Sequence, residues 1–502
     1  MPLPTMNRLP LHLGPTLLAA LLALAGCAVT PTYERPAVDT PAAFKEAGPQ
    51  QGAEGSQWKP SQPAEDMARG EWWKVFHDAD LDALEARAQA ANQNLKAAAA
   101  RLGQARALTR QAKSGYFPEV DAGIGATRQR PSPASQGLSA DAATQPNTLY
   151  RAQAGVSYEV DLFGRVAATV DAATADAQRS EALFHSVLLA LQADVAQQYF
   201  QLRELDAALA LYNGTVNLRA QSLKLVQRRF DEGDISEVDV ARARSELASA
   251  RADMLGIRRQ RAIAEHALAI LLGTPPSEFA MAARPLTRMN LGIPTGLPSA
   301  LLERRPDIAA AERAMAGANA RVGVARSAFF PSLSLTGALG YESAGLGELF
   351  NWSSRTFLLG PLVGTALSVP LFDGGRRQAE EDRARASYEE QVADYRGTVL
   401  NAFREVEDNL ANLRILGDQS RAQDEAVAAS ERAARLSHVQ YREGSVSYFD
   451  VIDADRTVLQ QQRASVQLDG ERARSTVNLI RALGGGWNAS TVPAVPQVSS
   501  AR

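Results

Sequence analysis

The feature that most restricts the fold of this chain is a proline-free stretch of 67 residues, from Val166 to Glu232. Within it, apolar residues recur in thirteen steps between Phe184 and Phe230, with Arg219 as the one exception. The mean step is about 3.5 residues, which is the repeat of a left-handed coiled coil. A helix of this length extends about 100 Å. The pattern therefore predicts an elongated helical protein rather than a small globular domain.

A shorter helix is predicted from Glu237 to Leu272, after a reversal at residues 233–236. The same pair is predicted again at 375–443 and 447–483. Glycine at each reversal permits the left-handed backbone with which helices commonly end. The apolar seam weakens in the second long helix, which indicates either a different neighbour or a wetter surface. The residues at the weakened positions are Ser420, Gln423, Ser430, Ala434 and Ser437.

The two helix pairs belong to an internal duplication with an offset of about 211 residues. The turn motif Phe-x-x-Gly-x-Ile-Ser-x-x-Asp-Val at 230–240 recurs as Tyr-x-x-Gly-x-Val-Ser-x-x-Asp-Val at 441–451. Tyr-Phe-Pro at 116–118 likewise recurs as Phe-Phe-Pro at 329–331. We therefore expect two tandem repeats of one structural unit.

The duplication divides the chain into six predicted segments. They are a signal peptide (1–26), an extended N-terminal segment (27–80), a first repeat (81–273), a linker (274–298), a second repeat (299–485) and a flexible tail (486–502). Each repeat is expected to contain a helix, a β-hairpin, a long helix and a shorter helix. The linker holds five prolines, so it cannot form one continuous helix.

A strand pattern precedes each long helix. Apolar and polar residues alternate over 150–161, as they do in a strand with one buried face. Residues 119–127 supply a partner strand, and the polar stretch 128–148 joins the two. In the second repeat, strands are predicted at 332–339 and 357–371. By pattern alone, two hairpins of a soluble β-sandwich fit equally well.

Geometry favours a membrane barrel, because four strands of about ten residues, bracketed by helices, match its short tilted spans. Four strands cannot close a barrel, and an open strand edge is not tolerated in lipid. The barrel must therefore be shared between chains, with eight strands from two copies or twelve from three. After the signal peptide, no apolar run approaches the ~20 residues that a spanning helix needs. The predicted fold class is an α+β membrane protein.

The N-terminus predicts export and lipidation. An apolar run over residues 17–25 follows Arg8, and it is too short to span a bilayer as a helix. It ends in Leu-Ala-Gly-Cys, which resembles the bacterial lipobox and implies that Cys27 is the lipidated first residue of the mature protein. Ala28, rather than Asp, implies sorting to the outer membrane. Because Cys27 is the one cysteine, intramolecular disulfides and cysteine-based zinc sites are excluded.

Composition and motifs argue against nucleic-acid binding and catalysis. The chain has 53 basic and 56 acidic residues and a net charge of −3, whereas nucleic-acid binding needs a basic surface. Its five histidines show no metal-ligand spacing, and no nucleophile elbow, phosphate loop or dinucleotide fingerprint occurs. We therefore expect no catalytic residue, no metal and no cofactor. A surface-anchored enzyme is the less favoured alternative.

Four motifs carry a resemblance to a known family. They are Trp-Trp-x-x-Phe-x-Asp-x-x-Leu at 72–81, Glu-Arg-Arg-Pro-Asp-Ile at 303–308, the turn at 444–451, and Ala-Leu-Gly-Gly-Gly-Trp at 482–487. With these motifs, nearly the whole mature chain resembles the TolC-like outer membrane factors. It is most similar to their lipidated branch, which serves resistance-nodulation-division efflux pumps.

The resemblance implies a homotrimer with a shared twelve-stranded barrel, four strands from each chain, joined to a long α-helical coiled-coil barrel in the periplasm. Part of 27–80 would contribute to an equatorial belt around the helices. The implied function is a passive exit duct that works with a periplasmic adaptor and an inner-membrane transporter, in contact with outer-membrane lipid. The alternative is a trimeric envelope lipoprotein without a conduit. Polar Arg151, Gln153 and Glu159 on one strand face speak against that alternative.

Asp450 and Asp453 lie three residues apart after the second turn, so they share one helix face. Acids at a helix N-terminus are also favoured by the helix dipole, which is the simpler interpretation of Asp450 alone. In TolC-like proteins, matching aspartates line the periplasmic mouth of the tunnel, and a trimer would bring six carboxylates together. Asp239 and Tyr441 match family positions that help to hold this mouth closed.

The resemblance also bears on the latch and on the adaptor. Some relatives carry an arginine two residues after the turn glycine, where this chain has Val446. The latch is therefore either weaker here or built from other residues, such as Arg442 or Arg456. Both turns are expected to dock the adaptor, and their glycines end helices whether or not they do so. The turn residues expected to do so are Gly233, Ile235, Ser236, Gly444, Val446 and Ser447.

Overall fold

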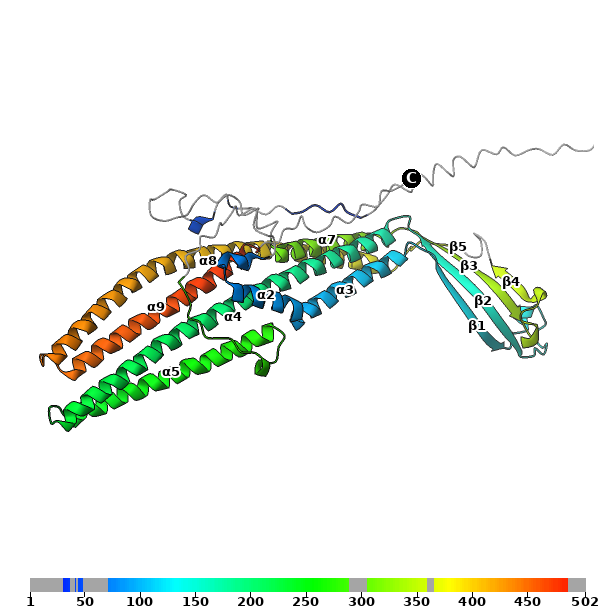
Figure 1. Ribbon diagram of the computed structural model, residues 1–502. Helices are drawn as coiled ribbons and strands as arrows, with labels where there is room; N and C mark the ends of the chain where they lie inside the picture. The colour runs from blue at the N-terminus through cyan, green and yellow to red at the C-terminus, as the bar shows by residue number, and fades with distance from the viewer. Residues whose placement is uncertain are drawn as a thin grey trace, which may run out of the picture. The chain divides into compact units, whose positions relative to one another are not determined.

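Figure 1 shows the computed structural model, in which long helices and an antiparallel sheet are the main elements. The structure describes residues 30–36, 41, 44–47, 71–288, 305–358 and 365–485. The expected signal peptide, the lipidation site at Cys27, residues 289–298 of the linker and the tail from 486 onward lie outside the described residues.

The four predicted long helices are confirmed to within about one residue at each end. They are α4 (Arg165–Asp231), α5 (Glu237–Leu271), α8 (Arg376–Arg442) and α9 (Tyr448–Ala482). The long member of each pair has 67 residues and the short member has 35, in both repeats. The duplication seen in the sequence is therefore also a duplication of helix lengths.

Local signals fix where these helices begin. The Asp161 carboxylate accepts hydrogen bonds from the backbone N–H groups of Val166 (3.0 Å) and Ala167 (2.8 Å), which satisfies donors at the start of α4. Asp373 does the same for Gly375 and Arg377 at the start of α8. Both long helices thus start from an aspartate that follows a strand segment.

Shorter helices precede the sheet in each repeat. They are α2 (Ala79–Ala91), α3 (Gln93–Ser114) and α7 (Pro306–Ser327). Asn92 separates α2 from α3, because its side-chain amide donates to the Leu271 carbonyl (2.9 Å) and its side-chain oxygen accepts from Leu95 N–H (3.0 Å). Through these bonds, the Asn92 side chain links the break between α2 and α3 to the end of α5. Single 3₁₀ turns occur at Lys45–Ala47, Trp72–Phe76, Ala134–Gln136, Pro276–Glu278, Leu346–Glu348 and Trp352–Ser354.

The hairpins of the two repeats form one antiparallel sheet. Its strands are β1 (Glu119–Gln129), β2 (Asn147–Val160), β3 (Ser332–Ser343), β4 (Arg355–Leu358) and β5 (Thr365–Ser368). β1 pairs with β2, β2 pairs with β3 across the repeats, and β3 pairs with both β4 and β5. The fourth predicted strand, 357–371, is therefore described as two segments on the same neighbour, with 359–364 outside the described residues.

The two faces of this sheet differ in polarity. The register places Arg151 beside Glu342 and Gln153 beside Gly340 on one face, and the Arg151 Nε lies 2.7 Å from the Glu342 carboxylate. The other face carries apolar side chains that nothing in the described chain covers, such as Ile124 (74% exposed) and Leu339 (61% exposed). The alternation predicted from the sequence is confirmed, but the apolar face is open in a single chain.

The chain forms two compact units; α4 and α8 contribute to both, whereas α5 and α9 belong to one of them. Unit 1 comprises residues 1–36, 102–180 and 311–395, and contains the sheet; unit 2 comprises the remainder. The core of unit 2 packs seam residues of α4, among them Val195, Tyr199 and Leu202, which are all fully buried. At the far end of the predicted seam, Phe230 is 36% exposed.

Of the two alternatives for the weakened seam of α8, the wetter surface does not hold at three of its five positions. Ser420, Ser430 and Ala434 are buried. The hydroxyls of Ser420 and Ser430 donate to the backbone carbonyls of Leu416 (2.7 Å) and Val427 (2.9 Å) of the same helix, so these hydroxyls keep a partner. Gln423 donates to the Gln461 side chain (2.8 Å) and backbone (3.0 Å) on α9. The α8–α9 contact at Gln423 is therefore polar and half-buried.

A buried acid is the exceptional feature of the unit 2 core. Glu85 of α2 is fully buried, and neither carboxylate oxygen has a partner among the described residues. Burial, with a smaller contribution from Asp82, raises the pKa of Glu85 to about 9. An unfolded chain titrates glutamate near pH ~4.3. Between these values the folded protein holds a proton that the unfolded chain has released, so stability falls as pH rises.

Replacing Glu85 with glutamine should remove this pH dependence. We expect the apparent melting temperature of the wild type in detergent to fall between pH 5 and pH 9, while that of Glu85→Gln stays nearly level and is higher at pH 9. Glu232→Gln, at an exposed glutamate, serves as the control and should behave as wild type. An equal fall of the melting temperature in all three proteins would show that groups other than Glu85 cause the pH dependence.

Candidate functional site

The two hairpin tips have the same backbone geometry. Gly233 and Gly444 adopt left-handed φ values of 85° and 76°. At the first tip, the N–H groups of Gly233 and Asp234 bond to carbonyls of α4, and at the second tip the equivalent groups of Gly444 and Ser445 bond to α8. A Cβ at either glycine would meet no atom within 4 Å. The glycines are therefore required by the turn and not by crowding.

The tips also begin the second helix of each pair in similar ways. Ser236 caps α5 by accepting from Val238 N–H (3.2 Å). At the start of α9, Ser447 and Asp450 form a capping box, in which the Asp450 carboxylate accepts from the Ser447 N–H (2.9 Å) and hydroxyl (2.7 Å). These bonds hold the pKa of Asp450 below its usual range. The simpler interpretation of Asp450, a helix-start acid, is therefore part of its structural role.

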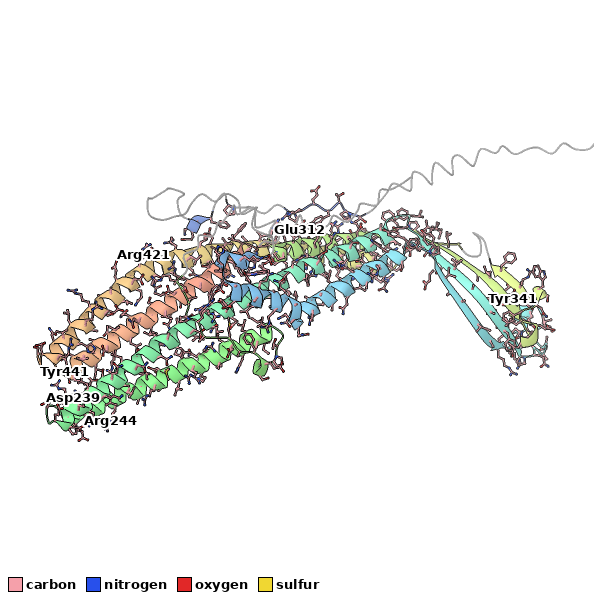
Figure 2. The ribbon with its side chains drawn as sticks, in the orientation of Figure 1. Asp239, Arg244, Glu312, Tyr341, Arg421 and Tyr441 are labelled. Carbon is pink, nitrogen blue, oxygen red and sulfur yellow. The ribbon has the colours of Figure 1, made fainter. Side chains whose placement is uncertain are left out.

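Asp450 and Asp453 are both exposed, three residues apart on α9. Figure 2 labels Asp239 and Tyr441 near this end of the hairpins. Asp239 lies 3.5 Å from Arg242 of its own helix. Tyr441 is buried against Tyr448, Arg229 lies over its ring at 5.1 Å, and its hydroxyl has no partner among the described residues. Within one chain, then, no hydrogen bond joins Asp239 to Tyr441.

A different ion pair links the two hairpins near their tips. Glu246 of α5 is buried and holds two arginines: Arg219 of α4 lies 3.1 Å from its carboxylate, and Arg456 of α9 donates to it from Nε at 3.0 Å. Arg219 also donates to the Glu246 carbonyl (2.8 Å). The Glu246 carboxylate thus connects α4 and α5 of the first repeat to α9 of the second. We call this cluster the hairpin latch.

The sequence indicated only part of the hairpin latch. Arg456 is one of the two arginines named as candidates for a latch, and the other, Arg442, is exposed at the end of α8. No sequence motif points to Glu246. The available signal was Arg219, the single charged residue at a position of the apolar seam, since a charge at a buried position requires a partner of opposite sign.

Beside the hairpin latch, α4 and α9 enclose a surface cavity of about 330 Å³. It is lined on α4 by small and apolar residues around Gly214 and Leu218, and on α9 by Asp455, Val458 and Leu459. Arg219 lies at its edge, so the cavity and the ion cluster adjoin.

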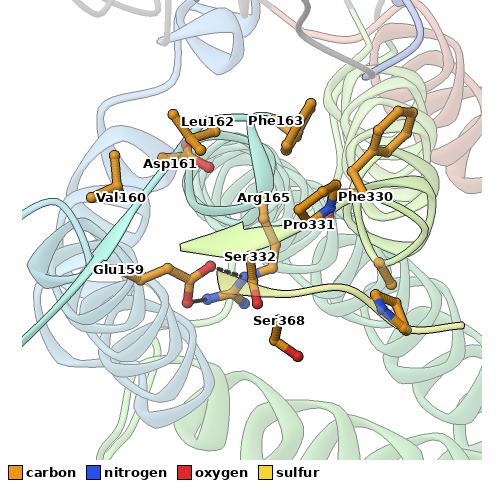
Figure 3. Close-up of a pocket in the computed structure, with 13 residues that line it drawn as sticks. Glu159, Val160, Asp161, Leu162, Phe163, Arg165, Phe330, Pro331, Ser332 and Ser368 are labelled. Carbon is orange, nitrogen blue, oxygen red and sulfur yellow. Dashed lines mark hydrogen bonds and ion pairs between the residues drawn. The ribbon is translucent and has the colours of Figure 1, made fainter. Parts of the chain in front are cut away.

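A second cavity of about 300 Å³ lies where strands give way to helices in unit 1, and Figure 3 shows its lining. Arg165 of α4 is bonded to both oxygens of Glu159 (2.6 and 2.5 Å). Phe163 stacks on Phe330 at 4.9 Å. Arg165 is the cation that lines this cavity and it is paired with Glu159, while no hydrogen bond among the described residues joins a serine of the lining to one of its carboxylates.

Three of the four motifs that carry the family resemblance, at 72–81, 303–308 and 482–487, meet in the unit 2 core, whereas the turn motif at 444–451 packs at the hairpin tips. Trp72 is buried and donates to Gln192 (3.0 Å), and a Cβ on Gly485 would approach the same indole. Arg305, also buried, pairs with Glu405 (2.7 Å) and donates to the Ala482 carbonyl (3.0 Å) at the end of α9. These contacts tie the three segments together in the unit 2 core.

Among the described residues, no helix is both long and apolar enough to cross a membrane. In the same ranges, no group of three or more histidine, cysteine, aspartate or glutamate side chains is arranged to hold a metal ion.

Comparison with known proteins gives a consistent result. The pattern of the family described as outer membrane efflux protein matches the chain twice, at residues 84–274 and 297–485. The chain is 34% identical to the probable efflux pump outer membrane protein TtgC of Pseudomonas putida, with 95% of this chain and 96% of TtgC covered. It is 35% identical to outer membrane protein OprJ of Pseudomonas aeruginosa, with 95% and 96% covered. The solved structure of the outer-membrane channel OprN superposes with a TM-score of 0.82 at 30% identity, covering 92% of this chain and all of OprN.

Proposed function

Because the chain belongs to the outer membrane efflux protein family, we propose that three copies of it form a gated exit duct in a tripartite pump. The protein is an outer membrane channel of an efflux pump. In this proposal the duct acts by passive conduction, without catalysis, and specific pumping is left to its partners.

The sheet supplies the observation that carries this proposal. β1 pairs on one side only, and β4 and β5 pair only with β3 among the described strands. An open edge with an uncovered apolar face is unstable in water and in lipid. Three copies would join these edges into one closed barrel, with the apolar face toward lipid and the Arg151 face toward the lumen. Because that inner face is polar, the interior of the closed barrel would hold water, as a channel requires.

Planar-bilayer recording of the purified full-length protein tests the proposal directly. We expect discrete, ohmic conductance steps from a species that native mass spectrometry identifies as a trimer. A trimer that never conducts, even after the hairpin latch is removed by mutation, would instead support the structural lipoprotein without a conduit. A conducting monomer or dimer would contradict the shared barrel.

The periplasmic end of the duct is proposed to close at the hairpin tips. Asp450 and Asp453 form the ring of acids at the mouth, and Asp239 and Tyr441 contribute packing or contacts between chains. The hairpin latch at Glu246 holds α9 against the first repeat. Val446 cannot form an ion pair. Among the described residues, the Arg456–Glu246 pair is the ion pair between the two hairpins that lies nearest their tips, and Arg474 of α9 pairs with Glu204 of α4 further from the tips.

The turns at the tips are proposed to dock the periplasmic adaptor, which in turn meets the inner-membrane transporter. Open space around Gly233 and Gly444 leaves the backbone accessible, with Ile235, Ser236, Val446 and Ser447 beside it. An outer membrane component of an efflux pump needs an adaptor and a transporter as partners. The tips are suited to meet the adaptor because they lie at the ends of the long helices α4 and α8.

Gly444→Leu should impair efflux at least ~10-fold in a drug-accumulation assay while trimer abundance stays normal, because a left-handed turn with a bulky side chain costs about 1–2 kcal/mol and blocks close approach. Gly417→Leu is the matched control, since this α8 glycine also has open space around it but has no positive φ. Loss of trimers in Gly444→Leu alone would mean that the turn serves folding rather than docking.

Cys27 is proposed to carry the lipid anchor of the mature chain. Intact-mass spectrometry of the mature protein should reveal an acylated N-terminal cysteine, and Cys27→Ser should lack the added mass. Barrel insertion should survive this substitution, because the barrel provides its own apolar surface. An unmodified peptide that retains residues before Cys27 would contradict the assignment.

A further inference from the structure

The apolar face of the sheet is bordered by arginines and aromatic residues at the end of the strands that lies away from the helices. Ala152 of β2 lies opposite both Ile124 of β1 and Tyr341 of β3, so these three side chains share the apolar face. Tyr341 in turn lies opposite Arg355 of β4. Arg128 also shares this face, because it follows Ile124 by four residues on β1. Figure 2 labels Tyr341 near this end of the sheet.

The loop after β3 presents two aromatic side chains at the same border. Phe350 is 66% exposed and meets Tyr341 edge-on, with the ring centroids 5.5 Å apart. Trp352 is 80% exposed, although the loop itself is anchored by the buried Leu349. Exposed aromatic residues at the ends of barrel strands are typical of a membrane–water interface. We call this border the outer rim, and its residues are Arg128, Tyr150, Tyr341, Phe350, Trp352 and Arg355.

The two arginines of the outer rim are exposed and have no acidic partner. Among the described residues, no carboxylate forms an ion pair with Arg128 or Arg355. Arg355 donates from Nε to the Trp352 carbonyl (3.1 Å), and its guanidinium lies over the Trp352 ring. By contrast, Arg151 on the opposite face of the sheet is paired with Glu342. The two outward cations are therefore available to an anion that comes from outside the chain.

The height of the outer rim matches the far boundary of a membrane. Strand β2 meets α4 shortly after Val160, and Tyr150 at the rim lies ten residues before Val160. Ten residues extend about 34 Å along a strand, and a tilt of about 35–45° reduces this to a height of about 24–28 Å. The apolar band of a membrane barrel is about 25 Å tall. With one end of the band at the strand–helix junction, the outer rim lies among the headgroups of the outer leaflet.

Closure of the barrel brings the two kinds of rim arginine together. Within one chain, β2 and β3 lie between β1 and β4, so Arg128 and Arg355 are about 14 Å apart across the sheet. In the proposed trimer, the free edge of β1 adjoins β4 of the next copy at one strand spacing, about 4.8 Å. Arg128 is one residue from the end of β1 and Arg355 is the first residue of β4, so each stands at the end of its strand. Two cations this close repel each other unless an anion lies between them.

We propose that each joint between copies binds a phosphate group of lipid A, the phosphorylated glycolipid of the outer leaflet, between Arg128 of one copy and Arg355 of the next. Arginine suits this role because its planar guanidinium can donate two parallel hydrogen bonds to a phosphate. The acyl chains of the lipid lie on the apolar face below, over exposed side chains such as Leu339 and Phe357. A lipid fits both parts of this surface, whereas a free phosphate ion fits only the rim. The inference rests on the proposed trimer.

Titration of the delipidated full-length protein with lipid A, followed by native mass spectrometry, tests this site. We expect the wild type to appear as a trimer that binds up to three molecules of lipid A. Arg128→Ala/Arg355→Ala should weaken this binding at least ~10-fold, because charge-assisted hydrogen bonds to the phosphate are lost. Arg151→Ala is the matched control, since it removes the same charge from the opposite face of the sheet and should bind lipid A as the wild type does.

Further variants and lipids keep the outcomes distinct. Arg128→Lys/Arg355→Lys retains both charges and should recover most of the binding, which separates a loss of charge from a loss of folding. Arg355→Ala alone should also weaken the binding, and it serves if the double alanine variant does not assemble. Equal binding of lipid A by wild type and alanine variants would overturn the site. Equal binding of phosphatidylglycerol, or of lipid A without its phosphates, by the wild type would do so too. A wild type that stays monomeric would instead contradict the trimer on which the site depends.

Discussion

Replacing Arg456 with alanine should raise the resting conductance of the channel by about ten-fold. The substitution removes the link from α9 to Glu246 and leaves the Arg219–Glu246 pair in place. A charge-assisted hydrogen bond to a buried carboxylate contributes about 1.5–3 kcal/mol. Because the Arg456 side chain is 58% exposed, we take the lower end, and 1.4 kcal/mol corresponds to a factor of about ten in an opening equilibrium.

A control variant and a double variant separate an effect on gating from a general loss of stability. Arg463→Ala, at an exposed arginine one to two turns further along α9, should leave the conductance unchanged. The double variant Glu246→Ala/Arg456→Ala should open no further than Glu246→Ala alone, because both substitutions break the same contact. Additive effects, or an unchanged conductance in Arg456→Ala, would show that the hairpin latch does not hold the closed state.

Replacing Asp450 and Asp453 together with alanine should abolish most of the block by trivalent cations applied from the periplasmic side. In a trimer, the substitution removes six carboxylates from the mouth. At an effective dielectric constant near 20, each close charge is worth up to about 4 kcal/mol. We therefore expect the half-blocking concentration to rise on the order of a hundred-fold. Equal block in wild type and variant would place the constriction elsewhere.

The capping box complicates the interpretation of Asp450 and suggests a control. Loss of a cap costs about 1 kcal/mol of helix stability, so Asp450→Ala also loosens the start of α9. Asp450→Asn/Asp453→Asn keeps a capping group while removing the charge, and it should lose the block with normal trimer stability. Since the pKa of Asp450 is lowered by Ser447, the charge persists at pH 5, and block by the wild type should be nearly the same at pH 5 and pH 7.

Local patterns in the sequence were sufficient to predict the elements. A seam of period 3.5, the absence of proline and a glycine at each tip determine α4 and its turn without reference to the rest of the chain. The duplication then extended the same prediction to α8 and α9. Residues such as Tyr199 and Leu202 are buried as the seam predicts, because burial of a helix face depends on local periodicity.

Which side chains pair with one another could not be predicted from local patterns. Arg219 was visible as an irregular residue, yet its partner Glu246 lies 27 positions along the chain, and the third member, Arg456, lies in the other repeat. The resemblance directed attention to Tyr441, whose hydroxyl has no partner among the described residues. A polar seam at Ser420 suggested solvent, whereas the hydroxyl is satisfied by its own helix. Such outcomes depend on three-dimensional packing and on competition among many charged groups.

The identical lengths of the paired helices, 67 and 35 residues in each repeat, carry an evolutionary consequence. Deleting one residue within α4 would turn everything beyond it by about 100° and shorten it by about 1.5 Å. The seam, the hairpin latch and the tip would then face different neighbours at a different height. Lineages of this protein should therefore accumulate substitutions along these helices while rejecting single-residue insertions and deletions. Length itself is under selection, and a change in one hairpin is tolerable only when the other changes with it.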